Sequence, residues 1–122
     1  MKFMCLAYED EQTFKDMSQK DWDTLREETI AYVTDLRDSG HLIATHALQS
    51  LRKTATVRVR GGSKLVTDGP FAEAKEQIGG FFLIDAKDRE EAVQLASRWP
   101  SARIGAIEVR PIEETLPTDK RY

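Results

Sequence analysis

Cysteine is nearly absent from this sequence, and its scarcity excludes two kinds of site. The 122 residues contain only Cys5, so the chain cannot form an internal disulfide or a metal site built from several cysteines. Cys5 stands in an apolar run, which favours a small buried side chain. A chain without disulfides fits a reducing compartment, and we expect a cytoplasmic protein.

An excess of positive charge is also missing. Eighteen Lys and Arg against 21 Asp and Glu give a formal net charge of -3, with both signs interspersed. Binding to a phosphate backbone requires a basic surplus, so we expect no direct contact with nucleic acid. The apolar residues 3–8 are followed at once by Glu9 and Asp10, a pattern that fits neither a signal peptide nor a membrane span.

The chain shows no repeat, no low-complexity tract and no linker, so residues 1–122 are predicted to form a single domain. Residues 3–8 and 79–84 are apolar without a polar face, which indicates buried strands. Ser18, with Asp21 three positions later, has the form of a capping box, and helical periodicity continues to Gly40. A second helix is predicted from Asp88 to Pro100, and a last strand at 104–109.

The middle of the chain is predicted to be extended. Residues 41–51 and 54–60 have strand patterning, and the turn at Gly61-Gly62 predicts a hairpin partner at 64–67. A helix-prone stretch follows at 72–77. This order predicts an α+β fold, a ferredoxin-like split βαβ with an antiparallel sheet. Because two helices cover only one face of such a sheet, a second copy of the chain is the simplest cover for the other, which predicts a homodimer.

Several segments together resemble the DGPF branch of the YCII-related family. They are Thr56-Val57-Arg58, residues 66–73 (VTDGPFAE), Lys75-Glu76, Gly79-Gly80-Phe81 and residues 107–111 (IEVRP). The resemblance spans nearly the whole chain and implies a dimeric α+β barrel, in which two ferredoxin-like sheets pack face to face. It implies no reaction, and some bacterial relatives are associated with extracytoplasmic-function sigma factors.

The wider YCII family is thought to use a His-Asp pair, with the His on the first helix and the Asp before a Pro at the end of the second. This sequence departs from the pattern at both places. It has Asp21-Trp22-Asp23 where the His is expected, and Trp99 precedes Pro100. The pair therefore cannot be carried over, and the Asp-Gly-Pro-Phe loop is the better candidate site.

Asp68 and His46 are the candidate catalytic residues. Pro70 restricts the loop, so Asp68 would present a preorganised carboxylate as a base or ligand for a cation. Capping of the turn, or of a short helix near Pro70, is the alternative that the residue type favours. His46 is expected to share a strand face with Leu42, Ala44 and Leu48, so its ring points to an apolar layer. There it could act as a neutral base, or it could be a hydrogen-bonded core residue.

Arg58, Asp68, Phe71 and Glu73 form the predicted ligand-binding set. Arg58 could hold a carboxylate or phosphate, although solvated arginines are more common. Glu73 and Glu76 could join His46 at a metal ion, but no two-His spacing supports such a site, so we predict no metal and no cofactor. Trp22 and Trp99 are predicted as core residues. Two classes of function remain: a binder or enzyme for a small anionic organic molecule, or a non-catalytic regulatory or interaction domain.

Overall fold

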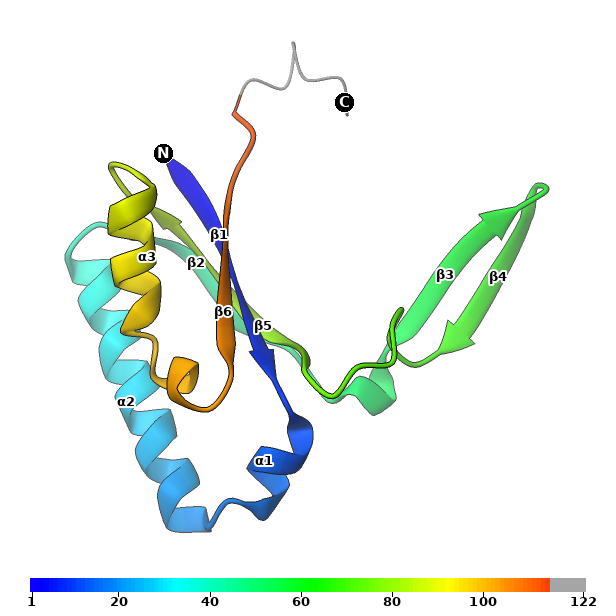
Figure 1. The fold of residues 1–122 in the computed structure, drawn as a ribbon, viewed down its shortest axis with the longest axis horizontal. Helices are drawn as coiled ribbons and strands as arrows, with labels where there is room; N and C mark the ends of the chain where they lie inside the picture. Colours follow the sequence, from blue (N-terminus) through cyan, green and yellow to red (C-terminus); the bar gives the residue numbers. More distant parts are fainter. Residues whose placement is uncertain (115–122) are drawn as a thin grey trace.

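The computed structural model describes residues 1–114. Within this range the chain forms strands, helices and two short 3-10 turns (Figure 1). In chain order they are β1 (Lys2–Glu9), α1 (Glu11–Asp16), α2 (Gln19–Asp38), β2 (Leu42–Ala47), η1 (Leu51–Lys53), β3 (Ala55–Arg60), β4 (Ser63–Asp68), β5 (Gln77–Asp85), α3 (Arg89–Ser97), η2 (Pro100–Arg103) and β6 (Ala106–Pro111). None of these helices has the length and apolarity to cross a bilayer.

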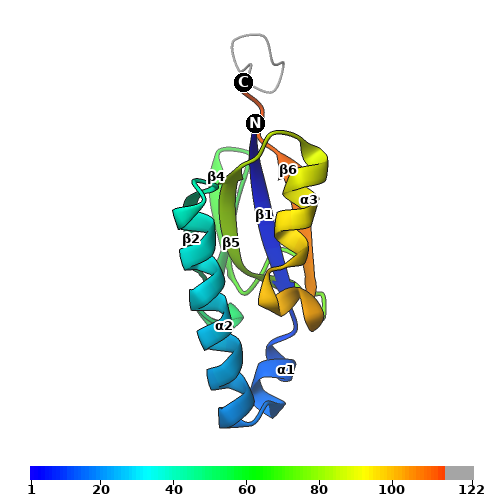
Figure 2. The ribbon, with the colours of Figure 1, turned by 90° about the vertical axis from the view of Figure 1, so that its left-hand side faces the viewer.

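Four strands form one antiparallel sheet in the order β2-β5-β1-β6. The first strand lies between the last two strands of the chain, which is the ferredoxin-like arrangement. Helices α2 and α3 both pack on one face of this sheet (Figure 2). The α+β fold predicted from the sequence is confirmed.

The core fills the space between this face and the two helices. Phe3 and Cys5 of β1 and Phe82 and Ile84 of β5 are almost fully buried there. Trp99 stacks on Phe82 with ring centroids 4.1 Å apart, so its predicted core position is confirmed. Burial raises the pKa of the Cys5 thiol to about 12, which keeps it protonated and unreactive at neutral pH.

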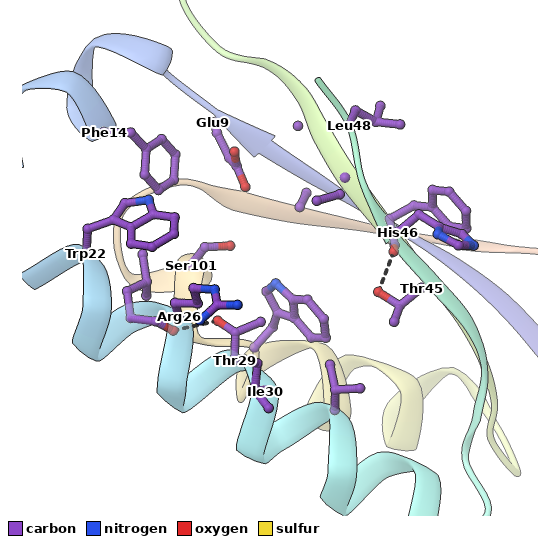
Figure 3. A pocket seen from close by; sticks show the side chains of 18 residues that line it. Glu9, Phe14, Trp22, Arg26, Thr29, Ile30, Thr45, His46, Leu48 and Ser101 are labelled. Atoms are coloured by element: carbon purple, nitrogen blue, oxygen red, sulfur yellow. Dashed lines mark hydrogen bonds between the residues drawn. The ribbon is translucent and has the colours of Figure 1, made fainter. Parts of the chain in front are cut away.

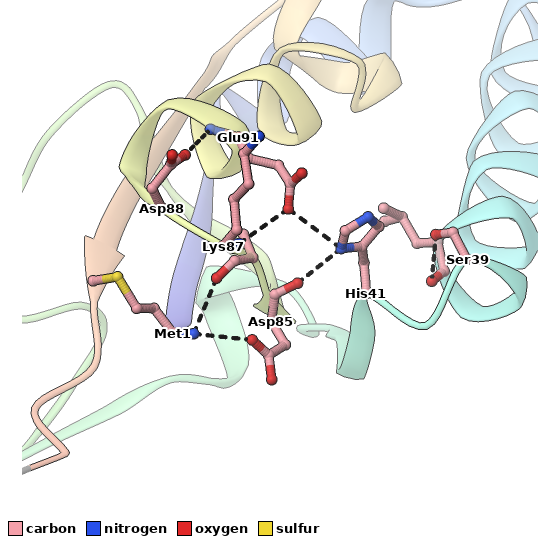
Figure 4. A network of polar contacts seen from close by, with 9 residues as sticks. Met1, Ser39, His41, Asp85, Lys87, Asp88 and Glu91 are labelled. Atoms are coloured by element: carbon pink, nitrogen blue, oxygen red, sulfur yellow. Dashed lines mark hydrogen bonds and ion pairs between the residues drawn. The ribbon is translucent and has the colours of Figure 1, made fainter.

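The predicted helix caps are present. Ser18 Oγ accepts a hydrogen bond from Asp21 N at 3.1 Å, and Asp88 Oδ1 accepts one from Glu91 N at 2.9 Å. Near the start of α3, the ring of His41 lies between the Asp85 carbonyl, 2.8 Å from Nδ1, and the Glu91 carboxylate (Figure 4). These contacts connect the loop after α2, the end of β5 and α3.

The second hairpin is separate from the four-stranded sheet. Within the described range, strands β3 and β4 pair only with each other, and they project away from the four-stranded sheet and its helices (Figure 1). Gly61 and Gly62, with φ of 56° and 78°, make the predicted turn. Val57 and Val66 face each other across the hairpin, and each is more than half exposed. We refer to residues 55–68 as the hairpin arm.

The sheet face opposite the helices carries apolar side chains. Met4 lies beside Leu83, and Leu6 beside Phe81, and all four are partly exposed. We call this surface, with Tyr8 added, the open face. Since both helices cover the other side of the sheet (Figure 2), the sequence-based expectation that the helices would leave one apolar face uncovered is confirmed.

One local expectation is wrong, and one helix was not expected. Residues 72–76, part of the stretch 72–77 that was expected to be helical, form bends and irregular backbone before Gln77 starts β5. The Gln77 amide donates to the carbonyl of Ala72 at 2.6 Å, and so short a segment gains too few helical hydrogen bonds to offset nucleation. Conversely, α1 was not predicted; the Asp10 carboxylate caps it by accepting from Gln12 N.

Candidate functional site

A cavity of about 380 Å³ lies between the N-terminal half of α2 and the sheet (Figure 3). Its volume is in the range of small-molecule sites. The lining residues come from β1, α1, α2, β2, β5 and η2: Ala7, Glu9, Phe14, Trp22, Leu25, Arg26, Thr29, Ile30, Val33, Thr45, His46, Ala47, Leu48, Gly79, Gly80, Phe81, Trp99 and Ser101. Within residues 1–114, no cluster of His, Cys, Asp or Glu is suited to holding a metal ion.

Small residues on the sheet explain the cavity. Beneath the N-terminal half of α2, the sheet presents Ala7, Ala47, Gly79 and Gly80, whose side chains are a methyl group or a hydrogen. Side chains of this size cannot fill the distance between a helix and a sheet, so space remains. The absence of large side chains on this part of the strands therefore explains why the cavity exists.

Glu9 projects its carboxyl into the cavity from the end of β1 (Figure 3). The pairing of β1 with β5 shifts by one residue between Ala7 and Tyr8, leaving Gly79 as an extra residue in β5. A Cβ at Gly79 would collide with the Glu9 carboxylate, so glycine leaves the space that this group occupies. Burial raises the pKa of Glu9 above its ordinary value, because low polarity disfavours the charged form.

Three hydroxyl groups line the cavity, and they differ in their bonding. Thr29 Oγ1 donates to the Leu25 carbonyl at 2.8 Å, and Thr45 Oγ1 donates to the Phe81 carbonyl at 2.9 Å. Ser101 is 6% exposed, and its Oγ has no hydrogen-bond partner within residues 1–114. Ser101 therefore carries an unused hydrogen-bonding group at the wall of the cavity.

Arg26 and Trp22 stand on the α2 wall of the cavity, across from Glu9 (Figure 3). The Arg26 guanidinium carbon lies 6.0 Å from the centroid of the Trp22 ring. Trp22 is 40% exposed, so the prediction that it belongs to the core is wrong. Its indole extends past the part of the sheet that carries large side chains and borders the cavity instead.

The predicted site residues lie mostly elsewhere. His46 lines the cavity, but its ring packs beside Phe81, 5.7 Å between centroids. The pairing of β2 with β5 shifts between Leu42 and Ala44, so Leu42 faces the helices and His46 faces away. The prediction that Leu42 and His46 share a face is wrong, because strict alternation ends at a bulge.

The other predicted residues belong to the hairpin arm and the loop after it. Arg58 lies over the Phe71 ring at 5.3 Å, so these two are brought together. Asp68 ends β4 and Glu73 is exposed. Among residues 1–114 the Asp68 carboxylate makes no hydrogen bond, and no helix starts near Pro70. The capping alternative for Asp68 is therefore wrong. A catalytic or ligand-binding role for Asp68, Arg58, Phe71 and Glu73 stays a prediction.

Glu9, Arg26 and Ser101 were missed by sequence reasoning. Glu9 was interpreted as the charge that ends an apolar strand, and Arg26 lies on a helix with many charges. Ser101 is in the short turn η2, where sequence patterns are weak. One signal was available: Trp22 and Trp99 occupy the places where the family resemblance leads one to expect a His and an Asp, and both line this cavity.

A four-stranded antiparallel sheet with two helices on one face defines a small ferredoxin-like domain of the α+β class, and a mainly apolar cavity with a few polar groups lies beneath its longer helix. The YCII-related domain matches residues 1–115, and the chain belongs to that family. It is similar to an uncharacterized protein from Rhizobium meliloti (strain 1021), with 33% identity over 114 residues, 92% of this chain and 92% of that protein.

Proposed function

We propose that the protein binds a small organic anion with an apolar body in the cavity beneath α2. The observation that carries this proposal is the pairing of aromatic walls with one cationic group and unsatisfied polar groups. Phe14, Trp22 and Trp99 supply the walls, and Arg26 supplies the positive charge. Sites for small molecules commonly combine a mainly apolar lining with a few polar groups that fix orientation.

The two charged groups fix the orientation of such a ligand. Arg26 on α2 attracts a carboxylate, and its guanidinium can donate two parallel hydrogen bonds. Glu9 stands on the opposite wall (Figure 3), so it repels the anionic end of a ligand whenever it is ionised. The apolar body then lies between the indole rings of Trp22 and Trp99.

Intrinsic fluorescence tests the proposal, because both tryptophans of the chain line the cavity. The probes are 3-phenylpropionate and its neutral analogue 3-phenylpropanol. We expect the acid to quench fluorescence in a saturable way, and Arg26→Gln to weaken its binding by about tenfold or more. Arg37→Gln is the matched control, since Arg37 lies exposed at the other end of α2.

Two results would contradict this function. One is the absence of saturable quenching by the acid. The other is equal binding of acid and alcohol, combined with equal affinities in the Arg26→Gln and Arg37→Gln variants. Circular dichroism of each variant shows whether its secondary structure is unchanged.

We also propose that a second copy of the chain covers the open face and the hairpin arm. A two-stranded hairpin is marginally stable alone, and this one exposes Val57 and Val59 by about 60%. Charge supports the same partner: the hairpin arm, residues 55–68, contains three basic side chains and one acidic side chain, whereas the rest of the chain has 20 acidic against 15 basic. A basic arm and an acidic body on one molecule are complementary in a two-fold pair.

Sedimentation equilibrium at micromolar concentration tests self-association. We expect a dimer, and we expect Val57→Asp to shift it to monomer, because the charge would be buried in an apolar contact. Thr67→Asp, on the other face of the same hairpin, is the control and should stay dimeric. A native protein that sediments as a monomer refutes the proposal, and the arm is then a surface for a different protein.

A further inference from the structure

Glu9 and Ser101 place a carboxyl and a hydroxyl group in one cavity, and neither has a hydrogen-bond or ion-pair partner within residues 1–114. Ser101 is buried, and Glu9 is half-buried. A buried polar group without a partner costs free energy and is found where a ligand, a water molecule or a reaction uses it. Thr29 and Thr45 already donate their hydroxyl protons to the backbone. Ser101 is therefore the cavity hydroxyl whose proton is not already donated to a protein carbonyl.

We propose that Glu9 exchanges a proton with the bound anion, and that the anion is a carbonyl acid with an enolisable carbon next to its carbonyl group. The inference rests on the proposed function, because it uses the same cavity and the same orientation by Arg26. In the forward step the Glu9 carboxylate removes a proton from that carbon. The C–H electron pair forms a carbon–carbon double bond, and the carbonyl π pair moves to the oxygen.

Ser101 donates a hydrogen bond to the enolate oxygen formed in this step. In the reverse step the Glu9 carboxyl returns a proton to the carbon, after exchange with water. Atoms and electrons balance without an oxidant, reductant or metal ion. Ser101 is 6% exposed, and the exclusion of water makes a hydrogen bond from its hydroxyl to a developing negative charge stronger than the same bond in solvent.

The backbone holds Glu9 in place for this role. Gly79 is the extra residue at the bulge in β5, and its carbonyl accepts a hydrogen bond from Leu48 N at 2.8 Å. That bond fixes the strand segment over which the carboxyl lies. Bulges redirect side chains and are frequent beside active sites. The raised pKa of Glu9 supports the same role, since a weaker acid has a more basic carboxylate.

Hydrogen–deuterium exchange at carbon measures the reaction directly. The probe is phenylpyruvate, which has a carboxylate, an aromatic body and an enolisable methylene group. In deuterated buffer, proton NMR follows the loss of the methylene signal. We expect the native protein to accelerate this loss above the rate of buffer alone.

Three variants test the separate roles of Glu9, Gly79 and Ser101. We expect Glu9→Gln to lose about 100-fold or more of the accelerated rate and still bind phenylpyruvate. Gly79→Ala should also lower the rate, because its methyl group displaces the carboxyl. Ser101→Ala should lower kcat with little change in KM. Glu27→Gln is the control, since this exposed glutamate of α2 does not line the cavity, and it should exchange at the native rate.

The results distinguish this inference from the proposed function. If phenylpyruvate binds in an Arg26-dependent way and exchange equals that of buffer, proton transfer by Glu9 is refuted and ligand binding stands. An unchanged rate in folded Glu9→Gln refutes it as well. If neither phenylpyruvate nor 3-phenylpropionate binds, the proposed function and this inference fail together.

Discussion

The two halves of α2 face the same sheet and meet different surfaces. Near its C-terminal end, Tyr32 and Leu36 are buried against large residues. Near its N-terminal end, Trp22, Leu25 and Thr29 continue the same helical stripe and border a cavity. The helix pattern is alike in both halves, so the difference comes from the sheet, where phenylalanines at one end give way to glycine and alanine at the other.

This comparison shows that an amphipathic stripe predicts burial only where the opposing surface has matching volume. Burial of apolar area stabilises one end of the helix, and the other end retains space for a ligand. The following changes test whether the two ends differ in this way, and they are ordered by expected effect.

The largest expected effect is at the packed end. Leu36→Ala removes a side chain that is 2% exposed, so we expect the free energy of unfolding to fall by about 2–5 kcal/mol. Leu25→Ala, at the cavity end of the same helix, should cost less than about 1 kcal/mol, because its neighbours leave space already. Urea denaturation measures both, and equal losses would contradict the comparison.

A smaller effect with the opposite sign is expected for Ser101→Ala. The hydroxyl is buried without a partner, so replacing it with hydrogen should raise the free energy of unfolding by roughly 1 kcal/mol. The same denaturation experiment applies. A loss of stability would mean that the Ser101 hydroxyl is satisfied in solution, and its availability to a ligand would be refuted.

The smallest effect concerns Glu9 and depends on pH. Its pKa is raised in the folded protein, so the folded state binds the proton more tightly than the unfolded state does. The stabilisation that the Glu9 carboxyl contributes is therefore present below its pKa in the unfolded state, and it is lost as pH rises through its pKa in the folded state. Glu9→Gln should gain stability relative to the native protein as pH rises over this window. If the difference in unfolding free energy between Glu9→Gln and the native protein did not depend on pH, the raised pKa of Glu9 would be contradicted.

Much of the fold was predictable because its signals are local. Ser18 and Asp88 mark the starts of their helices, and Gly61-Gly62 marks the hairpin turn. The apolar residues of β1 and β5 also predicted correctly that one sheet face would stay apolar. The independence of the hairpin arm was not predictable, since alternating valines look the same in an isolated hairpin and in a larger sheet.

The candidate site was largely unpredictable, for a physical reason. Its cavity exists because residues distant in sequence leave volume unfilled together, and no single segment carries that information. Glu9 depends on the bulge at Gly79; a glycine inside a strand is compatible with a bulge, but it does not show which side chain of the paired strand the bulge redirects. The face assigned to His46 was wrong for the same reason, because one extra residue in β2 reverses the direction of the side chains that follow.

The hairpin arm has one further consequence. Its strands share no backbone hydrogen bonds with the four-stranded sheet, so its amides can open to solvent without unfolding of the body. Amide exchange should therefore divide the molecule into a slow body and a fast arm. If a second copy holds the arm, its amides will become slower to exchange as the protein concentration rises, while those of Phe3 and Phe82 will not change.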